Sequence, residues 1–217
     1  MYVGRIVATG RTAAGRLFVA YRVSSRSFPN RDAVRVGETV QIRPRFGSPD
    51  EQSSNSYISY ECALWNNNFL VAGNGSHARF IFDRLVGGGS VRDCATAVLL
   101  GMAREFDQHD TPRIAAIADR RSRELYLASI TKSGLACIPV EAESGSARYI
   151  ATYHFPVPDA SQCARLNSER SADDLCRGLV EGNTFSDLTN AVCSVAVVDN
   201  DSALDVAVLN LGNLSAS

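Results

Sequence analysis

The sequence predicts an α+β fold in which most of the chain forms antiparallel strands. Strand-like segments outnumber helical segments and follow one another in hairpin-like succession. The helical segments are grouped, whereas regular alternation with single strands is typical of a doubly wound parallel sheet. At 217 residues the chain fits a single domain, 1–217, which can bury roughly 70% of its unfolded surface.

The first strands are predicted as a hairpin at the N-terminus. Residues 2–8 and 17–23 are apolar runs separated by a glycine-containing loop. Residues 44–56 are rich in Pro, Gly, Ser and Asn, which predicts an exposed loop. Two further strands are predicted at 57–64 and 69–72, with a turn between them.

Two amphipathic helices carry clear start signals. Ser90 is a good N-cap, and Asp93 stands three residues later, where a carboxylate can complete the cap. Apolar residues then repeat at helical spacing, which predicts a helix over 91–106. The same signal recurs at Ser171 and predicts a second helix that ends near Glu181.

The remaining elements are strands. Apolar residues 187–198 fit either a helix or a strand. The other predicted strands are 114–118, 125–130, 135–140, 149–153 and 205–211.

Composition excludes several classes of function. The net charge of −1 argues against a nucleic-acid binder, because phosphate neutralisation needs a basic face. No apolar run reaches the roughly 18 residues of a membrane span. The six cysteines and three histidines lack metal-ligand spacing, so no metal site is expected. Without a signal peptide, a reduced cytoplasmic environment is expected.

The densest polar motif is the segment Tyr21–Arg31, which follows an apolar strand. In an extended strand Arg22, Ser24 and Arg26 share one face and would converge on an anion such as a phosphate. The alternative is a solvated strand end, because this chain has a single lysine, Lys132, and uses arginine for its other basic side chains.

Three other segments carry candidate chemistry. The run Gly73–His77 offers backbone amides and a serine to an anion, although Asn-Gly is also a common hairpin turn. Glu105 is expected near a helix C-terminus, where the macrodipole raises the pKa of a carboxyl group; a frayed, solvated helix end is the alternative. Tyr57 and Tyr60 point to opposite faces of a strand, so at most one is expected in a site.

Taken together, these segments resemble the archaeal-type inosine monophosphate (IMP) cyclohydrolase family. The resemblance covers roughly residues 1–155 and is loose in the C-terminal third. It implies a fold similar to the N-terminal nucleophile (Ntn) hydrolases, a four-layer αββα sandwich. The chain begins Met1-Tyr2, so no terminal nucleophile is expected. The motifs that carry the resemblance lie at 1–6, 21–31, 57–62, 74–77 and 111–116.

The resemblance implies the last step of de novo purine synthesis. The substrate, 5-formamidoimidazole-4-carboxamide ribonucleotide, would close with loss of water to IMP, without a cofactor. The family suggests a homo-oligomer. We expect Glu105 to transfer protons, Tyr60 to act at the formyl oxygen and Arg22 to orient the substrate. The expected substrate-binding residues are Ser24, Arg26, Asn30 and Arg31 at the phosphate or ribose, and Asn74, Ser76 and Arg113 at the base.

Two alternatives stay open from the sequence. An Ntn-type amidohydrolase would act on a different amide and would need a processed terminal nucleophile. A non-catalytic purine-nucleotide-binding regulator would bind nucleotide without turnover.

Overall fold

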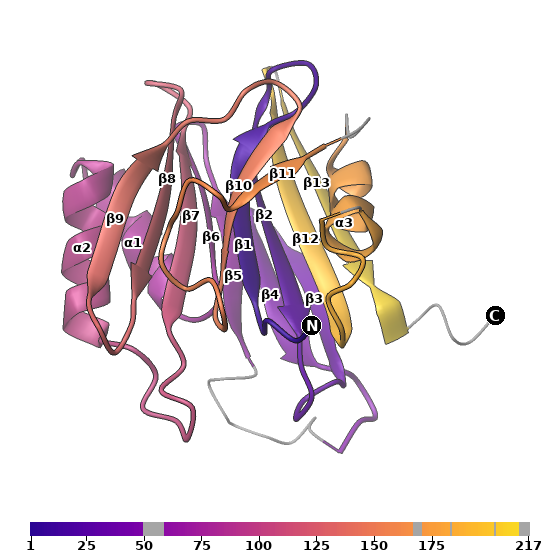
Figure 1. Cartoon of the computed structure of the whole chain (residues 1–217). Helices are drawn as coiled ribbons and strands as arrows, with labels where there is room; N and C mark the ends of the chain where they lie inside the picture. Colours follow the sequence, from indigo (N-terminus) through magenta and orange to yellow (C-terminus); the bar gives the residue numbers. More distant parts are fainter. Residues whose placement is uncertain (50–58, 167–170, 183, 202, 213–217) are drawn as a thin grey trace.

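The described part of the chain forms two antiparallel β-sheets and three α-helices. The computed structural model describes residues 1–49, 59–166, 171–182, 184–201 and 203–212. Within this part of the chain, one sheet has six strands and the other seven. Figure 1 shows the two sheets face to face, which confirms the predicted α+β class. No helix among the described residues is long and apolar enough to cross a membrane.

The six-stranded sheet has the order β11-β10-β1-β2-β12-β13, with antiparallel neighbours throughout. The predicted N-terminal hairpin is confirmed, because Ile6 pairs with Arg22 and Arg11 pairs with Leu17. The apolar segment that fitted either element is a strand, β12. The strands are β1 (Ile6–Arg11), β2 (Leu17–Ser24), β10 (Ser146–Ala151), β11 (Cys163–Arg165), β12 (Ala191–Asn200) and β13 (Ala203–Asn210).

The seven-stranded sheet follows the chain in order from β3 to β9. Each strand pairs antiparallel with the next, as expected for hairpins joined in succession. The strands are β3 (Arg31–Val36), β4 (Thr39–Pro44), β5 (Tyr60–Trp65), β6 (Phe69–Gly73), β7 (Arg113–Asp119), β8 (Glu124–Ile130) and β9 (Leu135–Val140).

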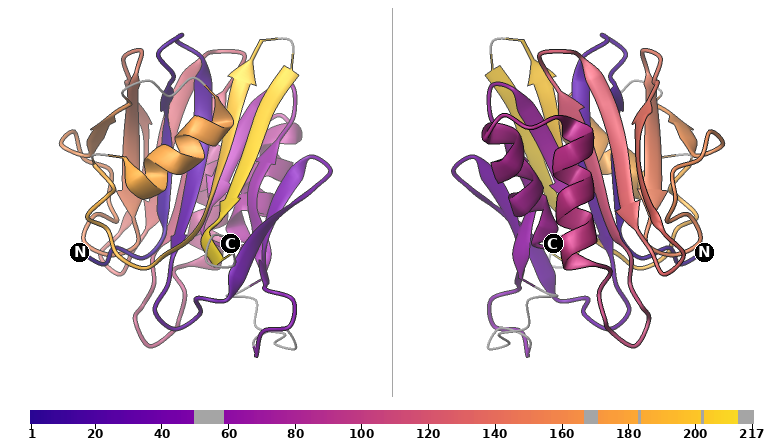
Figure 2. Two further views of the ribbon diagram at one scale, coloured as in Figure 1. Left: turned by 90° about the vertical axis from the view of Figure 1, so that its right-hand side faces the viewer. Right: turned by 90° about the vertical axis from the view of Figure 1, so that its left-hand side faces the viewer.

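The helices cover the outer faces of the two sheets. Helices α1 (His77–Val86) and α2 (Val91–Met102) pack on the seven-stranded sheet, and α3 (Ala172–Glu181) packs on the six-stranded sheet. Figure 2 shows these two coverings from opposite sides. The predicted N-caps are confirmed: the Ser90 hydroxyl accepts from the Asp93 amide at 3.1 Å, and Ser171 forms a full capping box.

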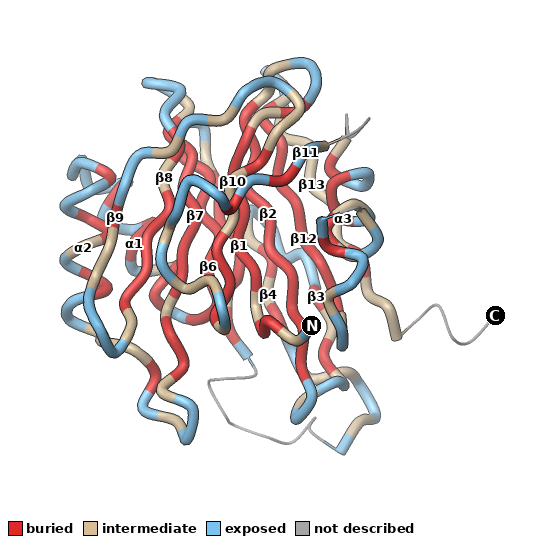
Figure 3. The backbone as a smooth tube through the Cα atoms, viewed as in Figure 1, coloured by how far each residue is buried: buried red, intermediate tan, exposed pale blue. Residues whose placement is uncertain are grey.

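The side chains of β2 alternate between two separate parts of the hydrophobic core. Val19 and Tyr21 face the seven-stranded sheet, whereas Phe18 and Ala20 face α3. Successive side chains of a strand point to opposite faces, so Arg22 lies on the α3 side with Phe18 and Ala20. Figure 3 shows that the buried backbone is concentrated in the strands of both sheets.

Several predicted boundaries differ from the structure. The first strand begins at Ile6 rather than Tyr2, because Gly4 adopts a left-handed φ of 72° that breaks the extended backbone. Helix α2 ends at Met102 rather than 106, where Ala103 takes a φ of 55°. Strands β3, β4 and β11 lie outside the predicted elements. Residues 34–36, the outer half of β3, are exposed, which explains why its apolar signal is weak.

Candidate active site

A cavity of about 660 Å³ opens where the N-terminal segment and the turn after β2 meet two loops. One loop follows α2, and the other follows β10. The lining combines arginine, carboxylate and aromatic side chains, which suits a polar ligand with a planar ring. Its walls include Tyr2, Arg5, Arg26, Glu105, His109 and Tyr153.

Glu105 is the buried carboxyl group of this cavity, with 4% of its surface exposed. The turn at Ala103 directs the chain inward, and the Glu105 amide donates to the Thr111 carbonyl at 2.9 Å. Burial raises the pKa of Glu105, while the positive charges of Arg5 and Arg113 oppose the rise. The raised pKa of Glu105 agrees with the expectation from the sequence. Its cause is burial and not the helix macrodipole, because α2 ends at Met102.

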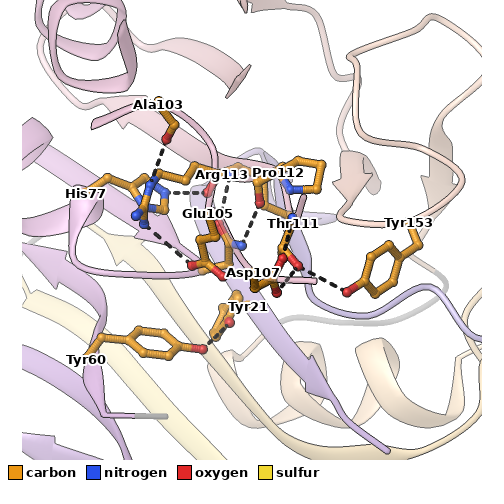
Figure 4. Close-up of polar contacts among 12 residues, drawn as sticks. Tyr21, Tyr60, His77, Ala103, Glu105, Asp107, Thr111, Pro112, Arg113 and Tyr153 are labelled. Atoms are coloured by element: carbon orange, nitrogen blue, oxygen red, sulfur yellow. Dashed lines mark hydrogen bonds and ion pairs between the residues drawn. The ribbon is translucent and has the colours of Figure 1, made fainter. Parts of the chain in front are cut away.

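Hydrogen bonds fix the loop that carries Glu105. The Asp107 carboxylate accepts from the Thr111 amide at 2.9 Å and from the Thr111 hydroxyl at 2.7 Å. The amide of His109 also donates to it, at 3.1 Å. The Thr111 hydroxyl lies 3.2 Å from the Tyr153 hydroxyl, which joins this loop to the loop after β10 (Figure 4). This segment is therefore a braced loop, not a frayed helix end.

Arg113 and Asn74 join β6 to β7 beside Glu105. Arg113 Nε donates to the Ala103 carbonyl at 2.9 Å, and Nη1 lies 3.5 Å from Glu105 Oε1. The Asn74 amide donates to the Pro112 carbonyl and accepts from the Ile114 amide, so its side chain holds the main chain in place. Ser76, at the start of α1, is exposed and makes no side-chain cap.

Two buried tyrosines form a hydroxyl pair between the sheets. The Tyr21 and Tyr60 hydroxyl oxygens are 2.7 Å apart (Figure 4). Burial raises the pKa of both side chains. The positive charges of Arg31 and Arg5 oppose the rise at Tyr60, which places both arginines near its hydroxyl. Such a hydroxyl can donate to, or accept from, a polar group in the site.

Arg31 is a fully buried arginine that forms few hydrogen bonds with the described residues. Its Nε donates to the Phe28 carbonyl at 3.1 Å, but Nη1 and Nη2 have no hydrogen-bond partner among the described residues. Its positive charge favours the ionised form of Glu105, a residue that lines the cavity. A buried, unpaired cation of this kind is a candidate anion ligand.

Arg22 and Ser24 lie on the other face of β2, away from the cavity. Arg22 donates to the carbonyls of Leu179, Phe185 and Leu188 over 2.5–3.1 Å, and its Nε donates to Ser24 Oγ at 3.1 Å. The predicted convergence of Arg22, Ser24 and Arg26 on one anion is not found. The reason is that the strand ends at Ser24, so Arg26 no longer follows its alternation.

Arg26 does reach the cavity, from the turn that follows β2. Its side chain is exposed, and its guanidinium carbon lies 4.2 Å above the centre of the Tyr2 ring. Asn30 lines a neighbouring hollow instead, together with Pro29. Ser25 borders both the cavity and this hollow. The turn thus contributes to two adjoining surfaces.

Sequence reasoning missed some of the residues that the fold brings together here. Arg5 and Tyr21 stand inside the quoted motifs at 1–6 and 21–31 but received no role. The charges of Tyr60, Tyr21 and Glu105 outweigh the effect of burial and raise the pKa of Arg5, so Arg5 lies among them. Tyr57 lies outside the described residues. No described group of three potential ligands could hold a metal ion.

Comparisons with known proteins identify relatives across most of the chain. The sequence profile of the family described as "IMP cyclohydrolase-like protein" matches residues 2–203, well beyond the 1–155 of the sequence resemblance. The IMP cyclohydrolase of Methanocaldococcus jannaschii is 36% identical over 93% of this chain and 96% of its own. The IMP cyclohydrolase of Methanothrix thermoacetophila is 36% identical over 97% of this chain and 99% of its own. The enzyme of Methanococcus maripaludis strain C5 is 42% identical over 85% of this chain and 90% of its own.

Proposed function

The chain belongs to the IMP cyclohydrolase family, and we propose on this basis that the cavity at Glu105 closes 5-formamidoimidazole-4-carboxamide ribonucleotide to IMP. The observation that carries the assignment of the site is the setting of Glu105. It is a buried carboxyl group with a raised pKa, in a cavity that arginines and tyrosines surround. A carboxyl group whose pKa is raised by burial can serve as a general acid or base.

Ring closure requires two proton movements. The carboxamide nitrogen attacks the formyl carbon, and one of its protons moves to the formyl oxygen. The new carbon–oxygen bond then breaks, and the formamide nitrogen loses its proton as the ring becomes aromatic. Both protons leave with the oxygen as water. Holding the two reacting groups in contact contributes much of the acceleration, because the reaction is intramolecular.

The Tyr60 hydroxyl is the proposed partner of the reacting oxygen. When Tyr21 donates in their shared hydrogen bond, the Tyr60 hydroxyl keeps its own proton to donate to the substrate, and the positive charges of Arg31 and Arg5 act on it. A hydroxyl donor placed this way stabilises negative charge as the tetrahedral intermediate forms.

Arg31 and Arg26 are the proposed anion ligands for the substrate phosphate. Arg31 offers two buried donor nitrogens that have no hydrogen-bond partner in the described part of the chain, and Arg26 offers an exposed guanidinium group at the cavity rim. Asn30 extends this phosphate side through the turn, whereas Ser24 is replaced in this proposal, because its hydroxyl faces away from the cavity and accepts from Arg22. Asn74, Ser76 and Arg113 are proposed for the base side, where Asn74 acts through the main chain it holds.

Arg22 has a different proposed role from the one its motif predicted. Because its donors are satisfied by main-chain carbonyls near the end of α3, it positions the Tyr21 strand instead of contacting the substrate. The assignment of Arg22 to substrate orientation is therefore replaced by a structural one in this proposal.

The layer order supports the wider expectations of the family. Two facing sheets with helices outside are consistent with an Ntn-like αββα sandwich, and we propose that residues 1–217 form one such domain. Exposed Phe80 and Leu100, on α1 and α2, support a homo-oligomer. All six cysteines are free, which fits a reducing cytoplasm. Light scattering on the purified protein would test the oligomer.

The experiment that tests the function is a spectrophotometric assay of IMP formation from the synthetic substrate. Wild type should turn over, and Glu105→Gln should lower kcat by roughly 10²–10⁴. Glu124→Gln, at an exposed carboxylate of β8 outside this cavity, is the matched control and should behave as wild type. Near-normal turnover of Glu105→Gln with normal substrate binding would remove Glu105 from the mechanism.

A further inference from the structure

Arg5 stands directly before β1 and faces the space between the two sheets. Its carbonyl accepts from the Thr152 amide at 2.9 Å, and its amide donates to the Thr152 hydroxyl at 3.0 Å. These two bonds continue the pairing of Ile6 with Ala151 by one residue. Arg5 therefore keeps the alternation of β1 and shares the face of Val7, which packs in the core between the sheets.

The guanidinium group of Arg5 has no hydrogen-bond or ion-pair partner among the described residues. Its Nε is buried and unpaired, and the residue lines the cavity at Glu105. Glu105 forms its ion pair with Arg113 instead, at 3.5 Å. Buried polar atoms in native proteins are almost always paired. An unpaired guanidinium group beside a cavity therefore indicates a position for a negatively charged atom of a ligand.

The groups around Arg5 place it at the reacting end of the cavity. Burial lowers the pKa of Arg5, but the charges of the buried tyrosine pair and of Glu105 oppose this effect, and the pKa is raised overall. Burial raises the pKa of Glu105, and Arg5 is the charge that most opposes this rise. Glu105 and Tyr60 are the groups proposed to move the proton and to contact the formyl oxygen. Arg5 thus lies beside the atoms that react.

We propose that Arg5 is a further catalytic residue, which donates hydrogen bonds to the formyl oxygen of the substrate while negative charge develops on that oxygen. The proposal rests on the proposed function. A guanidinium group suits this position, because it carries several donors and a positive charge that is not lost in proteins. Tyr60 supplies a neutral donor to the oxygen, and Arg5 supplies the opposite charge.

The charge on the oxygen follows from the electron movement in ring closure. As the carboxamide nitrogen bonds to the formyl carbon, one electron pair of the carbon–oxygen double bond moves to the oxygen. The attacking nitrogen gives a proton to the Glu105 carboxylate, and protonated Glu105 passes it to the oxygen. The resulting hydroxyl group leaves as water with a second proton, from the formamide nitrogen. Arg5 stays protonated throughout and stabilises the oxygen while it is negative.

Arg11, at the other end of β1, supplies a matched control. It lies outside the lining of this cavity, and its Nη2 donates to the Arg123 carbonyl at 2.8 Å. Arg5→Met keeps a long apolar side chain but removes the charge and the donors. Because the Arg5 guanidinium group has no described partner to lose, Arg5→Met should melt at or above the wild-type temperature.

The first test is the assay of IMP formation with both methionine variants. Arg5→Met should lower kcat by roughly 10²–10³, the effect of removing one oxyanion donor, with KM little changed. Arg11→Met should keep the wild-type kcat and KM. Arg5→Lys keeps the charge but not the planar fork of donors, so its kcat should lie between those of Arg5→Met and wild type. A wild-type kcat in Arg5→Met would overturn the proposal.

The second test asks whether Arg5 contacts the phosphate instead. The substrate nucleoside, which lacks the 5′-phosphate, should react with a lower kcat/KM than the nucleotide in the wild-type protein. Arg5→Met should show the same fold loss between nucleotide and nucleoside, because the phosphate ligands are unchanged. A much smaller loss in Arg5→Met, together with a raised KM for the nucleotide, would assign Arg5 to the phosphate and contradict a role at the formyl oxygen.

The pH profile checks the position of Arg5. Removing its positive charge should raise the pKa of Glu105 further, so the limb of the kcat/KM profile that reports Glu105 should move to higher pH in Arg5→Met. Arg11→Met should leave this limb in place. An unmoved limb in Arg5→Met would place Arg5 away from Glu105, and a lower melting temperature with wild-type kcat would make Arg5 structural; either result overturns the proposal.

Failure of the function and failure of the Arg5 role give different results. If wild type does not form IMP, the proposed function fails and the role of Arg5 fails with it. If wild type forms IMP while Arg5→Met turns over like Arg11→Met, only the role of Arg5 is lost and the function stands.

Discussion

Arg22 and Arg31 are both fully buried and stand nine residues apart, yet their surroundings differ completely. Arg22 lies beneath α3 and donates to three carbonyls and a serine. Arg31 lies near Tyr60 and Glu105 and uses only its Nε, leaving two nitrogens without partners among the described residues. The comparison teaches that hydrogen-bond saturation, and not burial, separates a structural arginine from a candidate ligand-binding one.

The largest effect is expected on stability, from substitution of the structural arginine, Arg22. Arg22→Met should lower the free energy of unfolding by about 2–4 kcal/mol, because buried carbonyls lose their donor and each unpaired group costs about 1–3 kcal/mol. Urea unfolding followed by circular dichroism measures the loss. The folded fraction should keep the wild-type KM; a large rise in KM with normal stability would invert the roles of the two arginines.

Arg31→Met should show the opposite behaviour. Removing its donors should raise KM by roughly 10–100-fold, since a hydrogen bond to a charged group contributes about 1.5–3 kcal/mol. Stability should fall by no more than the one bond to Phe28, about 1 kcal/mol. Steady-state kinetics and urea unfolding on the same preparation measure both. An unchanged KM would show that the unpaired nitrogens serve no anion.

A smaller effect distinguishes the two tyrosines of the buried hydroxyl pair. Tyr21→Phe should lower the free energy of unfolding by about 1 kcal/mol, because Tyr60 loses its 2.7 Å hydroxyl partner. Its kcat should fall less than that of Tyr60→Phe, which removes the hydroxyl proposed to contact substrate. Equal kcat values for the two variants would mean that the pair acts as one unit.

The smallest effect is a pH dependence. The raised pKa of Glu105 means that the folded protein binds this proton more tightly than the unfolded chain. That stabilisation is complete below the unfolded pKa, about 4.3, and is lost as pH rises through the higher folded pKa. Glu105→Gln, which is always neutral, should therefore gain melting temperature relative to wild type as pH rises. A difference in melting temperature between Glu105→Gln and wild type that stays constant as pH rises from about 4.3 would contradict the raised pKa of Glu105.

Much of the fold was readable in the sequence because it depends on local patterns. The caps at Ser90 and Ser171, and the apolar runs of β2 and β9, each carry their own signal in a few residues. Strand β3 carries no such signal, because half of it is exposed and main-chain hydrogen bonds pair it with β4. Pairing of this kind leaves little trace in residue type.

The candidate site was readable only in part. Glu105, Arg31 and Tyr60 were found as residue types within motifs, and the structure brings all three towards one interior region. Arg5 was missed because a single arginine in this composition carries little information. Which nitrogen of His77 carries the hydrogen depends on a contact of Nε2 with the Ile114 carbonyl, 37 positions away, which no sequence spacing reveals.

The sequence by itself determined the α+β class, the starts of α2 and α3, and the dense arginine–serine segment after β2, because propensity, capping and alternation act over a few residues. Only the tertiary structure decided which buried arginine is saturated and which nitrogen of His77 accepts. The same holds for the packing of Arg113, Glu105 and His77 around Gly75. Burial and hydrogen-bond partners are set by segments distant in the chain, and those partners decide whether a charged side chain supports the fold or binds a ligand.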